Sequence, residues 1–182
     1  MPNHWHLVVW PLQDGALSSY YVQWLTVTHV RRWHAHHHSA GTGPIYQGRF
    51  QSFPVQADEH FLSVCRSVER HALRANLVSR AEPWRWSSWW QRTQATQVPW
   101  LSEGPIALPG QWTEHVHDAQ TENELAASRR SVVRGVPYGD DAWQDQTAEV
   151  LSLRSSLHPP GRPRKPPKTK PDPFFSKAPP CI

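Results

Sequence analysis

Residues 58–78, DEHFLSVCRSVERHALRANLV, have the apolar spacing of an amphipathic helix that begins after an N-cap at Asp58. The side chains expected on its buried stripe recur every three or four residues: Phe61, Val64, Cys65, Val68 and Ala72. Ser67 and His71 are four residues apart, so both lie on one flank of this stripe. A polar pair beside the core can enter a cleft next to a sheet, which makes this flank a candidate site.

Other segments predict a mixture of helices and extended chain. Residues 4–10 have the character of a strand that ends at Pro11, and residues 45–56 alternate enough to be extended. Segments with helical spacing follow the first strand and come again late in the chain: 16–37, 122–134 and 140–153. Residues 100–118 carry mainly loop signals. At 182 residues the chain has room for one domain of typical size and a tail.

His4 and His6 are separated by one residue in the predicted strand. Because side chains alternate between the faces of a strand, both imidazoles point the same way. Two imidazoles on one strand face can chelate a metal ion, and the alternative is a pair of surface histidines. A third ligand decides between these readings. His71 supplies it if its helix faces the strand, and otherwise His71 is a partly exposed helix histidine.

The composition favours a reducing, cytoplasmic setting. The two cysteines, Cys65 and Cys181, form no CxxC pair. No apolar run approaches membrane-spanning length, and no charged segment precedes an apolar one as in a signal peptide. We therefore expect no membrane partner.

Residues 154–182 form a basic, proline-rich tail with seven lysines and arginines and one acid, whereas the whole chain has a net charge of +4. The tail lacks hydrophobic periodicity, so we expect it to be disordered and to bind a polyanion, nucleic acid first. Within it, GRPRK resembles the core of an AT-hook, which places Arg162, Arg164 and Lys165 at a narrow A·T-rich minor groove. A generic contact with phosphates is the alternative.

Several ordered segments resemble the REP-associated tyrosine transposases, which belong to the HUH single-strand transposase superfamily. They are MPNHWHLVVWP at 1–11, GTGPIYQGRFQSFPVQADEHFLSVCRSVERHALRANLV at 41–78 and PWRWSS at 83–88. The superfamily is named for histidine–hydrophobic–histidine, and HWH fits that name with Trp5 in the middle. The resemblance covers roughly residues 1–92 and continues more loosely through RRSVVRGVPYGDDAW and GRPRK.

The resemblance implies an α+β fold, a ferredoxin-like antiparallel sheet with helices. It divides the chain into a partial HUH catalytic domain at 1–92, a C-terminal helical region at 93–153 and a disordered basic tail at 154–182. Family members carry a strand, a helix and a further strand before the MPNH segment. We therefore expect the sheet to be incomplete at its N-terminus and the chain to be truncated.

The resemblance also implies a site. His4, His6 and His71 would hold a divalent cation, Mg²⁺ or Mn²⁺, with His71 standing where the family more often has an amide. The cation polarises a scissile phosphate in single-stranded or hairpin DNA, and a tyrosine attacks it. Arg49 could contact phosphates. A homodimer and a cytoplasmic, nucleoid-associated location are further implications.

Ser67 stands where the family has its catalytic tyrosine, four residues before the third ligand. A serine hydroxyl reaches less far than a phenol, is much less acidic and leaves less readily. Strand cleavage is therefore expected to be impaired.

Two functions remain open. One is a metal-dependent transposase that cuts and rejoins single-stranded DNA. The other is a non-catalytic DNA-binding remnant that acts through its basic tail, and Ser67 with the missing N-terminal elements favours it. A histidine-rich zinc-binding protein is a minor third reading.

Overall fold

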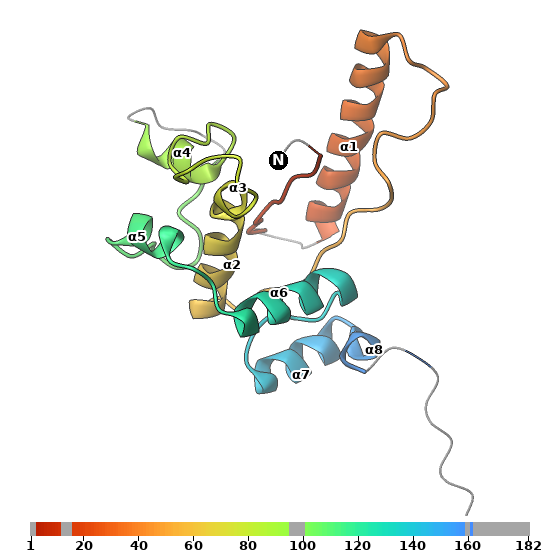
Figure 1. Ribbon diagram of the computed structural model, residues 1–182. Helices are drawn as coiled ribbons and strands as arrows, with labels where there is room; N and C mark the ends of the chain where they lie inside the picture. The colour runs from red at the N-terminus through yellow and green to blue at the C-terminus, as the bar shows by residue number, and fades with distance from the viewer. Residues whose placement is uncertain (1–2, 12–15, 95–100, 159–160, 162–182) are drawn as a thin grey trace, which may run out of the picture.

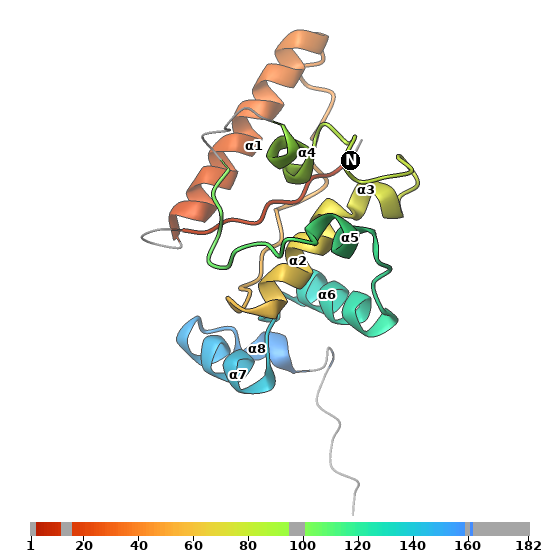
Figure 2. The same cartoon turned by 90° about the vertical axis from the view of Figure 1, so that its left-hand side faces the viewer.

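The structure of the chain is a computed structural model that describes residues 3–11, 16–94, 101–158 and 161. Its regular elements in these ranges are helices (Figures 1 and 2). Their bounds are α1 Ala16–His37, α2 Glu59–Glu69, α3 His71–Arg74, α4 Ser88–Thr93, α5 Trp112–His117, α6 Glu122–Arg134, α7 Asp141–Val150 and α8 Arg154–Leu157.

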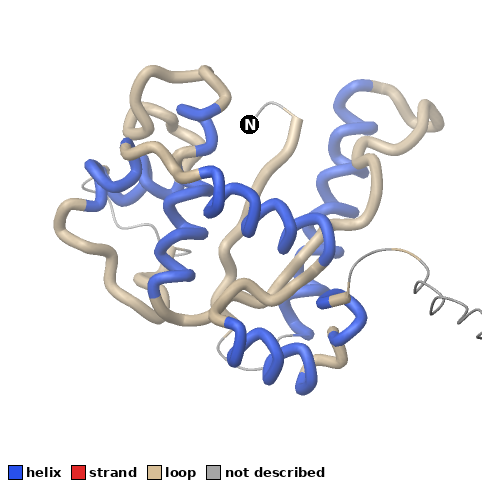
Figure 3. Tube along the Cα trace, turned by 60° about the horizontal axis from the view of Figure 1, so that its bottom comes forward, coloured by secondary structure: helices blue, strands red, loops and turns tan. Residues whose placement is uncertain are grey.

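The expected ferredoxin-like antiparallel sheet is wrong for the residues described. Figure 3 shows helices and loops and no strand in these ranges, and the pairing that remains is one isolated parallel bridge between Val55 and Tyr138. Extended segments become a sheet only when another strand lies alongside to complete the ladder of hydrogen bonds. Residues 4–10 have no such neighbour among the described residues, and in segment 45–56 Pro54 has no N–H to donate.

The predicted helices are largely confirmed. Helix α1 has the predicted bounds, and α2 begins after Asp58, whose side chain accepts a hydrogen bond from the backbone N–H of His60. The helix predicted over 58–78 is divided at Arg70 into α2 and α3, although the Arg70 N–H still donates to Arg66 O at 2.9 Å. The polypeptide turns away at Asn76, where φ is +54°.

The core lies where α2 packs against α5. Phe61 and Ala72 are buried as predicted, whereas Val64, Cys65 and Val68 are half-buried. Helix α5 lies in a stretch expected to be loop, and it contributes Trp112 and Val116, which are almost fully buried. A helix this short has a weak local signal, so its position depends on burying these two apolar side chains.

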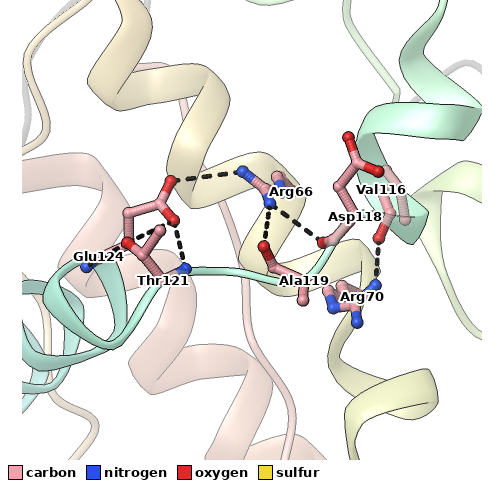
Figure 4. Close-up of polar contacts among 7 residues, drawn as sticks. All are labelled: Arg66, Arg70, Val116, Asp118, Ala119, Thr121 and Glu124. Atoms are coloured by element: carbon pink, nitrogen blue, oxygen red, sulfur yellow. Dashed lines mark hydrogen bonds and ion pairs between the residues drawn. The ribbon is translucent and has the colours of Figure 1, made fainter.

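Two charged residues of α2 are buried in the same region, which the apolar pattern did not indicate. Arg66 donates from Nη2 to the carbonyls of Asp118 and Ala119, both at 3.0 Å, and from Nη1 to Glu124 Oε1 at 3.3 Å (Figure 4). Glu69 accepts from Ser88 Oγ at 2.7 Å and from Trp112 Nε1 at 2.6 Å. These bonds compensate the loss of hydration, because buried charges must be paired and hydrogen-bonded.

Capping residues set the ends of the later helices. A capping box between Thr121 and Glu124 begins α6, which ends at Gly135 in the left-handed conformation. Asp140 caps α7. Both helices were predicted, although α7 ends at Val150 and the chain forms α8 immediately after it.

The segment between α6 and α7 is pinned to the segment before α2. Tyr138 N donates to Pro54 O and Gln56 N donates to Tyr138 O, both at 2.9 Å. Val136, Pro137 and Tyr138 are buried there. These contacts cross the domain boundary predicted after residue 92, because Pro54 and Gln56 lie before it and Tyr138 lies after it.

No described helix combines the length and the apolar character needed to cross a membrane.

Candidate metal centre

Three imidazoles from distant parts of the chain meet beside α3. His4 and His6 come from the extended segment 3–11, and His71 is the first residue of α3. His4 Nε2 and His71 Nε2 are 2.8 Å apart. One ring nitrogen from each of the three residues lies within 4.8 Å of the others. The structure thus brings together the three histidines that the sequence analysis selected.

A chain of hydrogen bonds indicates which ring nitrogen carries the proton in His71 and in His4. Arg74 Nη2 lies 2.8 Å from His71 Nδ1, and a guanidinium has only donors, so Nδ1 accepts. The proton of neutral His71 is then on Nε2, which donates to His4 Nε2. His4 in turn carries its proton on Nδ1 and donates to Asn3 Oδ1 at 2.7 Å.

The surroundings keep two of the rings neutral. Burial and the charges of His6, Arg74 and His4 lower the pKa of His71 to about 4. Burial and the charges of His4 and Arg74 lower the pKa of His6. Only an unprotonated imidazole nitrogen can bind a metal ion, so protons compete weakly for these ligands at neutral pH.

The donor set fits a transition-metal ion. With metal–nitrogen bonds of roughly 2.0–2.2 Å, ligand nitrogens stand about 3–3.5 Å apart, so small rotations of the rings bring the cluster to that geometry. Three imidazoles suit Zn²⁺ and other borderline ions, and Mn²⁺ accepts them too. Mg²⁺ prefers oxygen ligands, so the fit to Mg²⁺ is poor.

Ser67 lies four residues before His71 in the sequence. The helical hydrogen bonds around the junction of α2 and α3 run from Arg70 N to Arg66 O, from Arg74 N to Arg70 O and from Ala75 N to His71 O. A bond from His71 N to Ser67 O is not among those of the described residues, so the helical spacing is interrupted between these two residues, and Ser67 is half-buried.

Positive charge collects on the outer side of the cluster, which sequence reasoning missed. Arg74 is an exposed residue, and partial burial of its guanidinium and the positive charges of Arg129 and Arg70 lower its pKa. Arg70 is engaged elsewhere, with the carbonyls of Val116 and His117. The offset of three residues from His71 is a local signal for Arg74. No local signal points to Arg129, which comes from α6.

A second hydrogen-bonded group supports the opposite side of the histidine segment. Tyr46 Oη lies 2.8 Å from His29 Nδ1, and Trp5 Nε1 donates to it at 3.2 Å. Trp5 lies between the two histidines in sequence, so Tyr46 connects this segment to α1. The sequence analysis did not foresee this link.

Of the remaining sequence-predicted residues, Arg49 is described by the structure and is not part of the cluster. Arg49 is exposed in the connection between α1 and α2 and makes no ion pair with another described residue. Arg162, Arg164 and Lys165 lie outside the described residues. Gly161, which precedes Arg162 in the sequence, lies at a cavity of about 640 Å³. The cavity is lined by Ser52, Arg134, Gly135, Leu153, Ser155, Ser156, His158 and Gly161.

Comparison of the chain with models of protein families, with curated proteins and with solved structures finds no match.

Proposed function

We propose that the chain binds a divalent transition-metal ion through His4, His6 and His71 and, with it, a phosphate of single-stranded or hairpin DNA. The observation that carries the proposal is the meeting of imidazoles 67 positions apart, His4 and His71, with His6 beside both. Three imidazole rings at one point are an unusual use of polar side chains unless they share a ligand.

The charge around the cluster supports a phosphate partner. A bound divalent ion supplies a Lewis acid that stabilises negative charge on phosphate oxygens. Arg74 adds positive charge beside His71, and the charge of Arg129 acts on Arg74. Guanidinium groups match phosphate geometry with two parallel hydrogen bonds. The transposase resemblance agrees with this combination of metal and polyanion.

The serine at position 67 is the reason to propose that the chain binds DNA but does not cleave a DNA strand. It stands four residues before His71 in the sequence, where the resemblance expects the nucleophile, but its hydroxyl lacks the reach and acidity of a phenol. The proposed activity of this chain is therefore metal-dependent DNA binding, derived from a transposase.

The test is a pair of titrations with Mn²⁺ and Zn²⁺, monitored by calorimetry, followed by binding of a hairpin with a single-stranded extension. His4→Ala, His6→Ala and His71→Ala should each weaken metal binding strongly and reduce metal-dependent DNA affinity. His36→Ala, in the histidine-rich end of α1, is the matched control and should leave both unchanged. If the three variants bind metal as the parent chain does, the proposal is wrong.

A second candidate is DNA binding through the tail alone. Its support is the cavity whose lining includes Arg134, which adds a positive charge, and Gly161, the first residue of the GRPRK segment. The triple variant Arg162→Ala, Arg164→Ala, Lys165→Ala separates the candidates. Loss of all DNA affinity in this variant, with no effect of His71→Ala, favours the tail. Zinc binding with no DNA affinity in the parent chain favours a zinc-binding protein.

A further inference from the structure

Arg74 holds His71 in a state that cannot bind a metal ion through Nε2. The guanidinium occupies Nδ1 as a donor at 2.8 Å, so the ring proton is on Nε2. Coordination needs the lone pair of that same nitrogen, which faces His4 at 2.8 Å and belongs to the cluster. The residue that positions the ring therefore also blocks its ligand atom.

Metal binding requires Arg74 to move. When Nε2 coordinates, the neutral ring carries its proton on Nδ1, which then becomes a donor. Two N–H donors cannot face each other at hydrogen-bonding distance, so the guanidinium must leave Nδ1. The ring keeps its charge in this exchange, and only the position of its proton changes.

The surroundings indicate what draws Arg74 away. Arg74 is an exposed residue, and its guanidinium forms no ion pair with a carboxylate among the described residues. Its charged neighbours are arginines, Arg129 of α6 and Arg70. A guanidinium group without a carboxylate partner attracts an anion, and its planar fork can hold a phosphate group with two parallel hydrogen bonds.

We propose that Arg74 couples the two ligands of this site: a phosphate group that takes its guanidinium releases His71 to bind the metal ion. The inference rests on the proposed metal centre and adds a positioning residue to it. Linkage makes the effect reciprocal, so bound metal must strengthen phosphate binding by the same factor.

The experiment measures Co²⁺ binding to the full-length chain from its visible absorption, which reports metal held by protein ligands. Titrations are run in chloride, with inorganic phosphate and with a short single-stranded oligonucleotide. Either anion should tighten Co²⁺ binding, by about five- to a hundredfold if the coupling is of ordinary size. An effect of both anions identifies free phosphate as sufficient. An effect of the oligonucleotide alone identifies the nucleic-acid backbone.

Four variants separate the effect of the Arg74–His71 hydrogen bond from the effect of positive charge alone. Arg74→Ala, and Arg74→Met as a second variant that keeps an apolar stem, should bind Co²⁺ more tightly in chloride and show no effect of the anions. Arg129→Ala removes an equal charge without touching Nδ1, so it should change Co²⁺ affinity less and mainly weaken the coupling. Arg130→Ala, exposed on the same helix, should behave as the parent chain.

Nitrogen NMR of the imidazole rings reads the tautomer directly. His71 should carry its proton on Nε2 in the metal-free parent chain, and the Nδ1–H form should grow in Arg74→Ala. A proton on Nδ1 in the parent chain overturns the inference. So do equal gains in Co²⁺ affinity for Arg74→Ala and Arg129→Ala, or coupling that survives in Arg74→Ala. If the parent chain and His71→Ala bind Co²⁺ alike, the metal centre itself is wrong.

Discussion

The indole Nε1 of Trp112 donates a 2.6 Å hydrogen bond to Glu69 Oε2, and both side chains are buried between α2 and α5. Burial raises the pKa of Glu69, and the hydrogen bonds from Ser88 and Trp112 act in the opposite direction. The buried carboxylate of Glu69 and the buried indole of Trp112 thus satisfy each other's hydrogen-bonding groups.

Trp112→Phe should lower the free energy of unfolding by about 1–3 kcal/mol, because it leaves a buried carboxylate oxygen without its donor. The loss is expected to shrink as the pH falls toward the raised pKa of Glu69, since a protonated carboxyl needs that donor less. Urea denaturation at several pH values measures both effects. Trp86→Phe is the control, because that side chain is 71% exposed. A loss equal in both variants contradicts the prediction.

Arg66→Ala should destabilise the protein by about 2–4 kcal/mol, because two carbonyls and the Glu124 carboxylate lose their donor in a buried setting. Urea denaturation gives the magnitude. Arg130→Ala, on the exposed side of α6, should change the stability little. Arg66→Lys keeps the charge without the planar fork and should recover only part of the loss.

The metal-free protein should become less stable as the pH is lowered from about 6.5 to about 4. The unfolded chain takes up a proton at His71 near the ordinary pKa of 6.5, whereas the folded chain does so only near 4, so acid favours the unfolded state. Denaturation midpoints across this window measure the effect. His71→Gln should flatten the profile, and His36→Gln should not. An unchanged slope in His71→Gln rules out this source of acid sensitivity.

The parent chain should form no covalent adduct with a hairpin oligonucleotide in the presence of Mn²⁺, and Ser67→Tyr should form one. The substitution places a phenol four residues before His71 and supplies the reach and acidity that serine lacks. Denaturing gel electrophoresis with a labelled oligonucleotide detects the adduct. Ser67→Phe has nearly the same shape without the hydroxyl and is the control. An adduct in the parent chain shows that cleavage does not need the tyrosine.

Local signals were sufficient for most helices and insufficient for the sheet. The N-terminal ends of α2, α6 and α7 and the C-terminal end of α6 could be predicted because the residues that cap them are adjacent in sequence: Asp58, Thr121, Asp140 and Gly135. Strand formation depends on a partner elsewhere in the chain. Among the described residues, segment 45–56 obtains strand-like backbone pairing only with Tyr138, so its alternating pattern produced one bridge.

The histidine cluster was partly predictable for the same reason. Two ligands one residue apart and a third on a helix flank are local patterns, and they selected His4, His6 and His71. The approach of Arg129 to Arg74 depends on how α6 packs, which no local pattern encodes. The buried charges of Arg66 and Glu69 were missed because charge predicts exposure unless the partners are known.

The bonds from residues 54–56 to Tyr138 and Asp140 close a loop of more than eighty residues, as Gln56 and Asp140 are 84 positions apart. Closing so large a loop costs conformational entropy before the stabilising contacts across it can form. We therefore expect these bonds to form late in folding. The halves of the chain that they join should melt together, in one cooperative transition rather than two.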